Sequence, residues 1–217
     1  MTGIVDYNAG NIRSVERALD CLKAPFVLSQ KPGELENCDR LIFPGVGDAA
    51  YAMEQLHVTG FDCFLKEWAA AGKPLVGICL GSQIIFEHSE EGNVDCLGLM
   101  EGTIRHFASI WNDSHTNTDG SLKVPHMGWN DIAYENGSSK LLADVPEHSD
   151  FFFVHSYLIQ PSDASIIKAY ADYGIQVPAV VEKGNITAFQ FHPEKSGKNG
   201  MQILRNYVQK DLEAASC

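Results

Sequence analysis

The sequence has few basic residues and no long apolar run. Its 217 residues include 16 Lys and Arg against 28 Asp and Glu, which gives a formal net charge of −12. Such a field repels a phosphate backbone, so the composition argues against nucleic acid as a partner. No 18-residue apolar stretch predicts a membrane span, and Met1 is followed by T-G-I-V-D-Y without the basic and apolar regions of a secretion signal. We therefore expect a cytoplasmic protein with no membrane contact.

Cysteine pairs with the spacing of metal sites or disulfide frameworks are also missing. The six cysteines stand at positions 21, 38, 63, 79, 96 and 217, and no two form a C-x-x-C pair. The spacing predicts neither a zinc site nor a disulfide scaffold, so most of these thiols are expected to be small buried apolar groups. A G-x-x-x-x-G-K-S/T loop is absent too, which leaves nucleotide hydrolysis without support. We expect no metal and no cofactor.

Short apolar runs rich in β-branched residues alternate with helical patterns in the first half of the chain. The runs have the length of strands buried on both faces, and they cover residues 3–7, 25–28, 40–43 and 74–78. Apolar positions 12, 15, 19 and 22 predict a helix that Asn11 is placed to cap, and positions 61, 64, 65 and 68 predict another that stops at Gly72. This alternation implies a parallel sheet with right-handed crossovers.

The second half is richer in strands than in helices. Helical patterns are restricted to residues 140–145 and 201–212, and the polar stretch 112–121 is expected to form a loop. We predict one α/β domain over residues 1–217, with a mostly parallel central sheet flanked by helices and mixed or antiparallel strands in the second half. The strands expected in that half cover residues 102–107, 131–134, 151–159, 166–173, 179–182 and 187–191.

The most informative segment joins the strand at 74–78 to a helical pattern through Cys79. It reads G-x-C-x-G, a nucleophile elbow with sulfur in place of oxygen, in which the glycines let backbone crowd around a strained residue. A helix N-terminus favours the reactive thiolate, and the N–H of Leu80 is placed to stabilise an oxyanion. The alternative is that Cys79 is a small core residue, as expected for the other cysteines.

A thiol nucleophile needs a base, and the segment F-Q-F-H-P-E supplies one in His192. Residues two apart at the end of a strand project to the same side, so Glu194 is expected to accept a hydrogen bond from His192 and stabilise its imidazolium. His126 and His155 are the competing histidines. His155 ends an apolar run without an acid nearby, and we expect it to line the site or support the structure. Cys79, His192 and Glu194 are therefore the predicted catalytic residues.

A third segment, L-I-F-P-G-V-G-D-A-A over residues 41–50, predicts a strand, a glycine turn and a helix. As G-x-G-x-x-A it resembles a dinucleotide fingerprint, but the acid that should end the next strand about 20 residues later is missing. The alternative is an oxyanion turn through Gly45, Val46 and Gly47. Its backbone N–H groups would complete an oxyanion hole with Leu80. We favour the second interpretation, because a nucleophile and a base already require such a hole.

With these motifs in place, the chain resembles the class I, or triad, glutamine amidotransferases, whose sheet carries G-x-C-x-G-x-Q and H-P-E. Further segments resemble the glutaminase subunits of imidazole glycerol phosphate synthases, which act in histidine biosynthesis. P-H-M-G-W-N and H-P-E-K-S are specific to these subunits, and the likeness spans residues 6–196. The segments are D-Y-N-A-G-N-I-R-S-V from residue 6, P-G-V-G from 44, P-H-M-G-W-N from 125, V-H-S-Y from 154 and Q-F-H-P-E-K-S from 190.

The resemblance implies a glutaminase reaction. Cys79 attacks the side-chain amide of glutamine, His192 transfers the protons, and water hydrolyses the glutamyl thioester to glutamate after ammonia has left. By the same analogy, four residues hold the amino-acid end of glutamine. These are Gln83, Glu91, Ser156 and Tyr157.

The resemblance also implies a partner, a (β/α)8-barrel cyclase subunit that forms a heterodimer with the chain. The cyclase receives the ammonia and makes imidazole glycerol phosphate and aminoimidazole carboxamide ribotide. The chain has no phosphate loop and a negative charge, which fits a division of labour in which the cyclase binds the phosphorylated substrate. Activity is expected to be low until the cyclase binds, because the turn at 44–47 must reorient to complete the oxyanion hole. The expected docking residues are Asn11, Arg17, Trp129 and Lys195.

Two positions depart from the family pattern, and three rival functions stay open. Ser82 stands where Met or another apolar residue is usual, and Ala9 where Gly or Pro-like variants are frequent; neither carries the chemistry. The rivals are a glutaminase subunit of another synthase, a cysteine peptidase or other thiol hydrolase, and a non-catalytic binding module. P-H-M-G-W-N with Lys195 argues against the first, P-G-V-G with Gln83 against the second, and an intact triad against the third.

Overall fold

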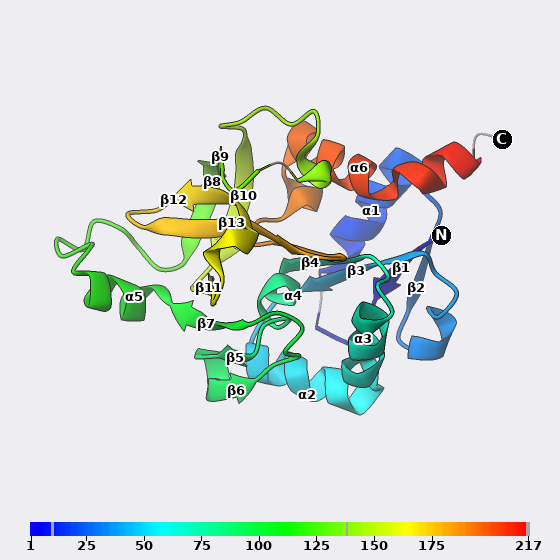
Figure 1. Cartoon of the computed structure of the whole chain (residues 1–217), viewed down its shortest axis with the longest axis horizontal. Coiled ribbons are helices and arrows are strands. Elements are labelled where there is room, and N and C mark those ends of the chain that lie inside the picture. Colours follow the sequence, from blue (N-terminus) through cyan, green and yellow to red (C-terminus); the bar gives the residue numbers. More distant parts are fainter. Residues whose placement is uncertain (10, 138, 216–217) are drawn as a thin grey trace.

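An eight-stranded mixed sheet forms the centre of the molecule (Figure 1). The computed structural model describes residues 1–9, 11–137 and 139–215, so Gly10 of the first motif and Cys217 lie outside the described residues. The first five strands in the order below are parallel and the last three are antiparallel. The order is β2 (Phe26–Ser29), β1 (Thr2–Val5), β3 (Arg40–Gly45), β4 (Leu75–Cys79), β14 (Ile186–Phe189), β13 (Gln176–Lys183), β12 (Ile167–Asp172) and β9 (Ala133–Tyr134).

The parallel strands lie where the sequence predicts them, since each is a short apolar run. β1, β4 and β14 are buried along their whole length, as expected when helices cover both faces of a sheet. β4 lies between β3 and β14, and Gly45 at the end of β3 is paired with Cys79 at the end of β4. The three segments with predicted chemistry therefore meet at one edge of the sheet.

Two smaller sheets lie beside the antiparallel strands. β8 (His126–Asp131) pairs with β10 (Asp150–His155), and a four-stranded sheet has the order β11 (Tyr157–Pro161), β7 (Gly102–His106), β5 (His88–Ser89) and β6 (Val94–Asp95).

The prediction of one strand over residues 151–159 is wrong, because the chain leaves β10 at His155 and enters another sheet as β11 at Tyr157. The strand predicted at 131–134 is likewise wrong in part. Asp131 ends β8, in which only His126 is buried, and only residues 133–134 join the central sheet.

Besides the helix after Cys79, which is described below, the helices differ from prediction in three places. The segment from Phe107 to Ser114 forms a helix that was not predicted, because only Phe107 and Trp111 are buried and its end is polar. Residues 140–142 form a single 3-10 turn. Asn11 precedes its helix, but its side chain accepts from the Ser14 hydroxyl and caps no backbone N–H. The helices in the described part of the chain are α1 (Ile12–Leu22), α2 (Ala49–Thr59), α3 (Phe61–Ala70), α4 (Leu80–Gln83), α5 (Phe107–Ser114) and α6 (Gly197–Ala215).

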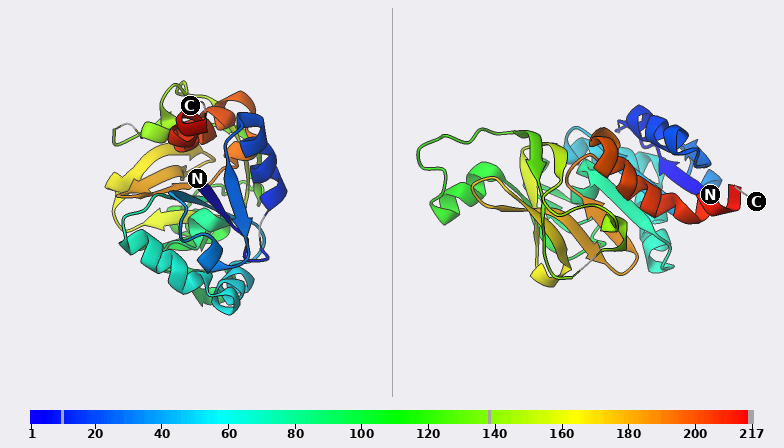
Figure 2. Two further views of the ribbon diagram at one scale, coloured as in Figure 1. Left: turned by 90° about the vertical axis from the view of Figure 1, so that its right-hand side faces the viewer. Right: turned by 90° about the horizontal axis from the view of Figure 1, so that it is seen from above.

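Helices cover both faces of the parallel half of the sheet (Figure 2). On one face α1 and α6 pack against strand residues such as Ile42 and Val76. On the other face α2 and α3 pack against Leu41 and Leu75, the alternate positions of the same strands. The result is a three-layer α/β arrangement that leaves the ends of the strands free to carry a site.

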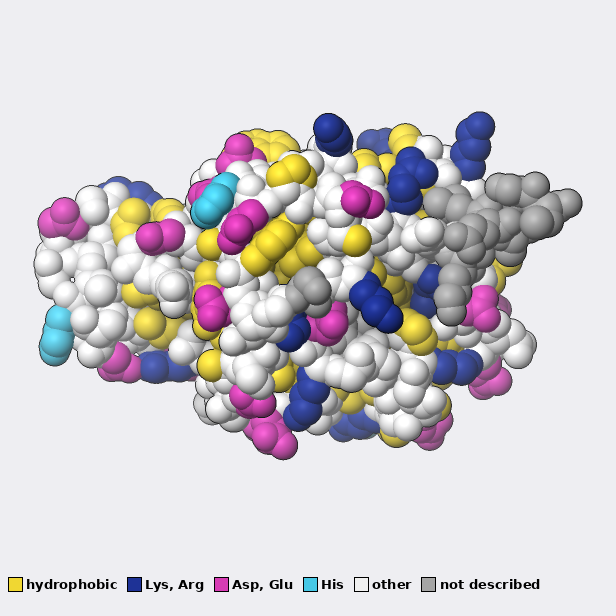
Figure 3. Space-filling view, turned by 45° about the horizontal axis from the view of Figure 1, so that its top comes forward, with side chains coloured by type: hydrophobic (Ala, Val, Ile, Leu, Met, Phe, Trp, Pro, Cys, Tyr) yellow, Lys and Arg dark blue, Asp and Glu magenta, His cyan; other side chains and the backbone are white. Residues whose placement is uncertain are grey.

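The surface mixes charges of both signs. On the face shown in Figure 3, acidic and basic side chains are interspersed with small apolar patches. Within the described residues, no helix combines the length and the apolar character that crossing a membrane requires.

Candidate active site

Cys79 lies on the sharp turn between β4 and α4. Its φ of 54° and ψ of −112° lie outside the regions that residues with a side chain normally adopt. The flanking glycines make this turn possible. A Cβ on Gly81 would clash with the carbonyl oxygen of Phe43, and a Cβ on Gly77 would lie 2.8 Å from the carbonyl oxygen of Gly81. The chain thus has the elbow geometry that the G-x-C-x-G spacing predicts.

The helix after Cys79 is shorter than predicted. α4 is a single turn, because the carbonyl groups of residues 84–86 accept hydrogen bonds from the backbone of residues 97–100 instead of continuing the helix. A single turn carries a small dipole, so the helix N-terminus contributes little to stabilising a thiolate. The Cys79 thiol donates to the carbonyl oxygen of Val154 at 3.9 Å, and Cys79 also raises the pKa of His192.

His192 follows β14 and is held by Glu194. Its Nδ1 lies 2.7 Å from Oε1 of Glu194, and both side chains are 2% exposed. Burial lowers the pKa of His192, but Cys79 and Glu194 raise it, and the resulting pKa is about 9. The carboxylate therefore fixes the hydrogen on Nδ1 and stabilises the imidazolium. Nε2 of His192 has no hydrogen-bond partner among the described residues, which leaves it available to a reacting group.

Ser196 positions this histidine and was not predicted as a site residue. Its hydroxyl donates to the carbonyl oxygen of His192 at 2.6 Å and accepts from the N–H of Phe152 at 3.0 Å. The N–H of His192 in turn donates to the carbonyl oxygen of Phe152 at 3.0 Å. The signal in the sequence was the last letter of H-P-E-K-S, whose position after a 3-10 turn places the hydroxyl beneath the histidine backbone.

A cavity of about 400 Å³ brings most of the predicted site residues together. Glu194, which is hydrogen-bonded to His192, and Gly45, the last residue of β3, do not line the cavity. Across the described residues, no group of three or more His, Cys, Asp or Glu side chains is arranged to hold a metal ion. The predicted residues that line the cavity are Val46, Gly47, Cys79, Leu80, Gln83, Glu91, Ser156, Tyr157, His192 and Lys195.

The oxyanion turn does not present both expected N–H groups to the cavity. The N–H of Val46 donates to the carbonyl oxygen of Ala9 at 3.2 Å, and is therefore engaged on the side of β1. Gly47 has a φ of 99°, which suits glycine. Position 45 has no room for a side chain, because an added Cβ would lie 2.6 Å from both the amide nitrogen of Gly81 and the hydroxyl of Tyr7. The predicted oxyanion hole is therefore incomplete in this conformation.

The far end of the cavity is acidic. Oε2 of Glu91 accepts the N–H of Ala49 at 3.0 Å, which ties the carboxylate to the start of α2. Burial raises the pKa of the Tyr157 hydroxyl, and the negative charges of Glu91, Asp48 and Glu90 raise it further. These carboxylates favour a cationic group of a ligand at this end.

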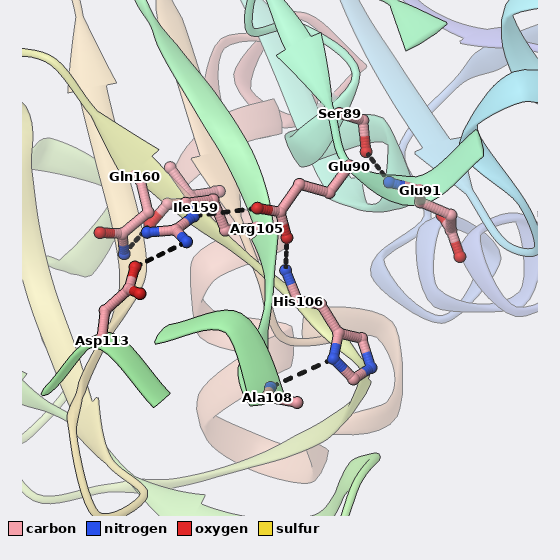
Figure 4. A network of polar contacts seen from close by, with 9 residues as sticks. All are labelled: Ser89, Glu90, Glu91, Arg105, His106, Ala108, Asp113, Ile159 and Gln160. Carbon is pink, nitrogen blue, oxygen red and sulfur yellow. Dashed lines mark hydrogen bonds and ion pairs between the residues drawn. The ribbon is translucent and has the colours of Figure 1, made fainter. Parts of the chain in front are cut away.

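Glu90 fixes the segment that carries Glu91. Its carboxylate accepts from Arg105 at 3.0 Å and from the backbone N–H of His106 at 2.7 Å, and Arg105 also pairs with Asp113 (Figure 4). The segment is thereby anchored to β7, while Glu91 points away from the network.

Gln83 is a structural member of the site. Its Nε2 donates to the carbonyl oxygen of Tyr157 and to Oε1 of Gln190, both at 2.9 Å. Both amide hydrogens are thus committed within the protein. Only its carbonyl oxygen is left for a ligand.

The four predicted docking residues do not all lie at the cavity. Lys195 lines the cavity, whereas Asn11, Arg17 and Trp129 do not. Trp129 is 58% exposed and lies on the same strand as Met127, which is 63% exposed. Two large apolar side chains that are exposed on the same strand form a patch of the kind that marks interaction sites, so β8 presents a surface suited to docking.

The family described as Glutamine amidotransferase class-I matches residues 4–210. "Imidazole glycerol phosphate synthase subunit HisH" of Halalkalibacterium halodurans is 44% identical, with 99% of each chain covered. The protein of the same name from Bacillus subtilis is 41% identical, with 98% of each covered.

Solved structures show the same fold. One described as "Crystal structure of glutamine amidotransferase" has a TM-score of 0.71 at 18% identity, with 98% of each chain covered. "Structure of PurLQS from Thermotoga maritima" has a TM-score of 0.68 at 19% identity, with 96% of this chain and 97% of that chain covered.

Proposed function

The chain belongs to the class-I glutamine amidotransferase family, and we propose that it is the glutaminase subunit of an imidazole glycerol phosphate synthase. In this role it hydrolyses L-glutamine and delivers ammonia to a cyclase subunit, which makes imidazole glycerol phosphate and aminoimidazole carboxamide ribotide. The choice of synthase is supported by relatives named as its subunit HisH, which are 41% to 46% identical over nearly their whole length.

Cys79 is the proposed nucleophile. Its thiolate attacks the side-chain carbonyl carbon of glutamine, and the imidazolium of His192 protonates the departing amide nitrogen, so that ammonia and a glutamyl thioester result. Water then attacks the thioester. His192 accepts a proton from this water, the thiolate leaves, and glutamate is released. Glu194 keeps the imidazole ring oriented and stabilises its charged form throughout.

The cavity offers complementary groups for both ends of glutamine. Glu91, with Asp48 nearby, suits the α-ammonium group, and the neighbouring polar groups of Ser156 and Tyr157 suit the α-carboxylate. The side-chain amide would then lie toward Cys79.

The oxyanion turn must rearrange before the reaction proceeds. Rotation of the peptide between Gly45 and Val46 would break the bond to Ala9 and turn the Val46 N–H toward the oxyanion, beside that of Leu80. One such donor contributes about 3 to 4 kcal/mol to lowering the barrier. We propose that cyclase binding favours the rotated form and so couples ammonia release to the presence of the cyclase.

The cyclase is proposed to dock on the surface around β8, with Asn11, Arg17, Trp129 and Lys195 as contacts. Exposed Trp129 and Met127 supply apolar area. Lys195 borders the cavity and follows Glu194 directly, so a partner that pairs with it would contact the catalytic segment.

The observation that carries the proposal is that the strained Cys79 and His192, which is buried with its partner Glu194, line one cavity. The test is ammonia release from L-glutamine, measured with and without the cyclase subunit and its nucleotide ligand. Cys79→Ala should lose at least a thousandfold in kcat, whereas Cys63→Ala, which removes an exposed thiol, should match the native chain. Undiminished turnover in Cys79→Ala overturns the mechanism. Stimulation by a different synthase subunit in place of the cyclase would overturn the pathway assignment.

A further inference from the structure

Two histidines that the proposed chemistry does not use form a buried pair beside the cavity. Nδ1 of His126 lies 3.0 Å from Nε2 of His155, and the two residues are 3% and 5% exposed. The His126 ring stacks on Tyr173 and on Phe153, with centroid distances of 4.1 and 4.7 Å. Only His155 of the pair lines the cavity. The pair therefore connects β8 to the wall of the site.

The partners of the two histidines determine which ring nitrogens carry hydrogen. Nδ1 of His155 lies 2.7 Å from the carbonyl oxygen of Tyr157, which only accepts, so this nitrogen carries the hydrogen. Nε2 of neutral His155 then accepts from Nδ1–H of His126. Nε2 of His126 in turn accepts from Nδ2 of Asn130 at 3.3 Å, and that amide gives its other hydrogen to the carbonyl oxygen of Asp172 at 2.8 Å. Each ring nitrogen has one partner.

Both rings must be neutral for this series of hydrogen bonds to form. A proton added to His155 would leave two N–H groups facing each other at 3.0 Å. The surroundings oppose that proton: burial lowers the pKa of His126 to about 4. Burial and the neighbouring His126 and His192 lower the pKa of His155 to about 3. At neutral pH the pair is a fixed polar link.

The link ends on the corner that carries part of the proposed glutamine site. Ser156 is the single residue between β10 and β11, where the chain passes from one small sheet to another. The bond from His155 to the Tyr157 carbonyl closes this corner, and the same carbonyl accepts from Gln83 at 2.9 Å. The Ser156 carbonyl accepts from the N–H of Phe107 at 3.1 Å. The corner is thus held from three sides.

We infer that His126 and His155 are positioning residues that fix the Ser156–Tyr157 corner for binding glutamine. This inference rests on the function proposed above. His155 holds the Tyr157 carbonyl, and His126 holds the ring of His155 in the orientation that does so. Loss of the link leaves Cys79, His192 and Glu194 in place, and so weakens substrate binding more than it slows the chemical steps.

The test compares three variants of the full chain in complex with the cyclase. His126→Leu removes both ring nitrogens, and we expect about a tenfold rise in the KM for glutamine with kcat within about twofold. His126→Asn retains a donor in the place of Nδ1, and should return KM to within about threefold of the native value. Phe153→Leu removes a ring that stacks on His126 but no hydrogen bond of the link. It should lower the midpoint of thermal unfolding and leave KM unchanged.

Equal rises in KM for His126→Leu and Phe153→Leu would overturn the inference, because packing alone would then explain both. An unchanged KM in His126→Leu, or a fall confined to kcat, or no recovery in His126→Asn, overturns it too. A parallel titration of L-glutamine into Cys79→Ala, with and without His126→Leu, reports binding without turnover, and should show the same tenfold weakening. If the native complex releases no ammonia from glutamine, the proposed function fails; loss of the KM effect alone overturns only the positioning role.

Discussion

The amide nitrogen of Val46 lies 3.2 Å from the carbonyl oxygen of Ala9, so the proposed oxyanion donor of the turn beside Cys79 is engaged elsewhere. We expect the Val46 amide to lose this hydrogen bond when glutamine and the cyclase bind together. In ¹H–¹⁵N spectra of Cys79→Ala, which does not turn glutamine over, the Val46 signal should shift on forming the ternary complex. The control is the Leu97 amide, which donates to the carbonyl oxygen of Ile84 at 2.9 Å and is not part of the turn. An unchanged Val46 chemical shift would contradict the proposal that the turn gates the reaction.

The His192–Glu194 pair makes stability depend on pH. Because the folded-state pKa of His192 is raised to about 9 from an ordinary 6.5, the pair stabilises the fold fully below about pH 6.5, and this contribution is lost as the pH rises through 9. Glu194→Gln removes one of the charges that raise this pKa. We expect its free energy of unfolding in urea to fall less than that of the native chain between pH 6.5 and 9.5.

The matched control for Glu194→Gln is Glu16→Gln. It makes the same change in net charge on α1, where Glu16 pairs with the exposed Arg13. This variant should keep the native pH dependence, because pairs on the surface contribute little. Identical pH profiles for native and Glu194→Gln chains would contradict the assignment of the raised pKa to this pair.

The elbow and the H-P-E pair were predictable because each is local. Glycines two residues from Cys79 and an acid two residues from His192 fix their geometry within a few residues of the chain. The alternation of apolar runs likewise predicted the parallel strands. In these segments the local pattern and the tertiary packing favour the same conformation.

The features that sequence reasoning missed depend on partners far along the chain. Nothing near Ser156 shows that residues before and after it pair with β8 and β7. α4 stops after a single turn because the backbone of residues 97–100 binds the carbonyl groups of residues 84–86, and the link between His126 and His155 joins positions 29 apart. Such contacts are set by tertiary packing, which periodicity in one sequence does not contain.

Ser196→Ala should affect both stability and catalysis. Its hydroxyl serves the carbonyl of His192 and the N–H of Phe152, and both would be left buried without that partner. We expect a loss of about 1 to 3 kcal/mol in unfolding free energy, with kcat reduced about tenfold and KM within about twofold, since the histidine and not the substrate is displaced. Ser149→Ala is the control, because the Ser149 hydroxyl donates to Pro146 away from the site. Equal losses of kcat in the two variants would contradict a positioning role for Ser196.

Tyr7→Phe should stabilise the protein. The Tyr7 side chain is fully buried after β1, and its hydroxyl has no hydrogen-bond partner among the described residues. A buried hydroxyl without a partner costs about 1 to 3 kcal/mol, so removing it should raise the free energy of unfolding by about 1 kcal/mol. Tyr207→Phe is the opposite case, because the Tyr207 hydroxyl donates to the carbonyl oxygen of Leu41 at 2.7 Å. That variant should lose about 1 kcal/mol in the same urea titration. If both substitutions lowered stability alike, the Tyr7 hydroxyl would have to be hydrogen-bonded in solution.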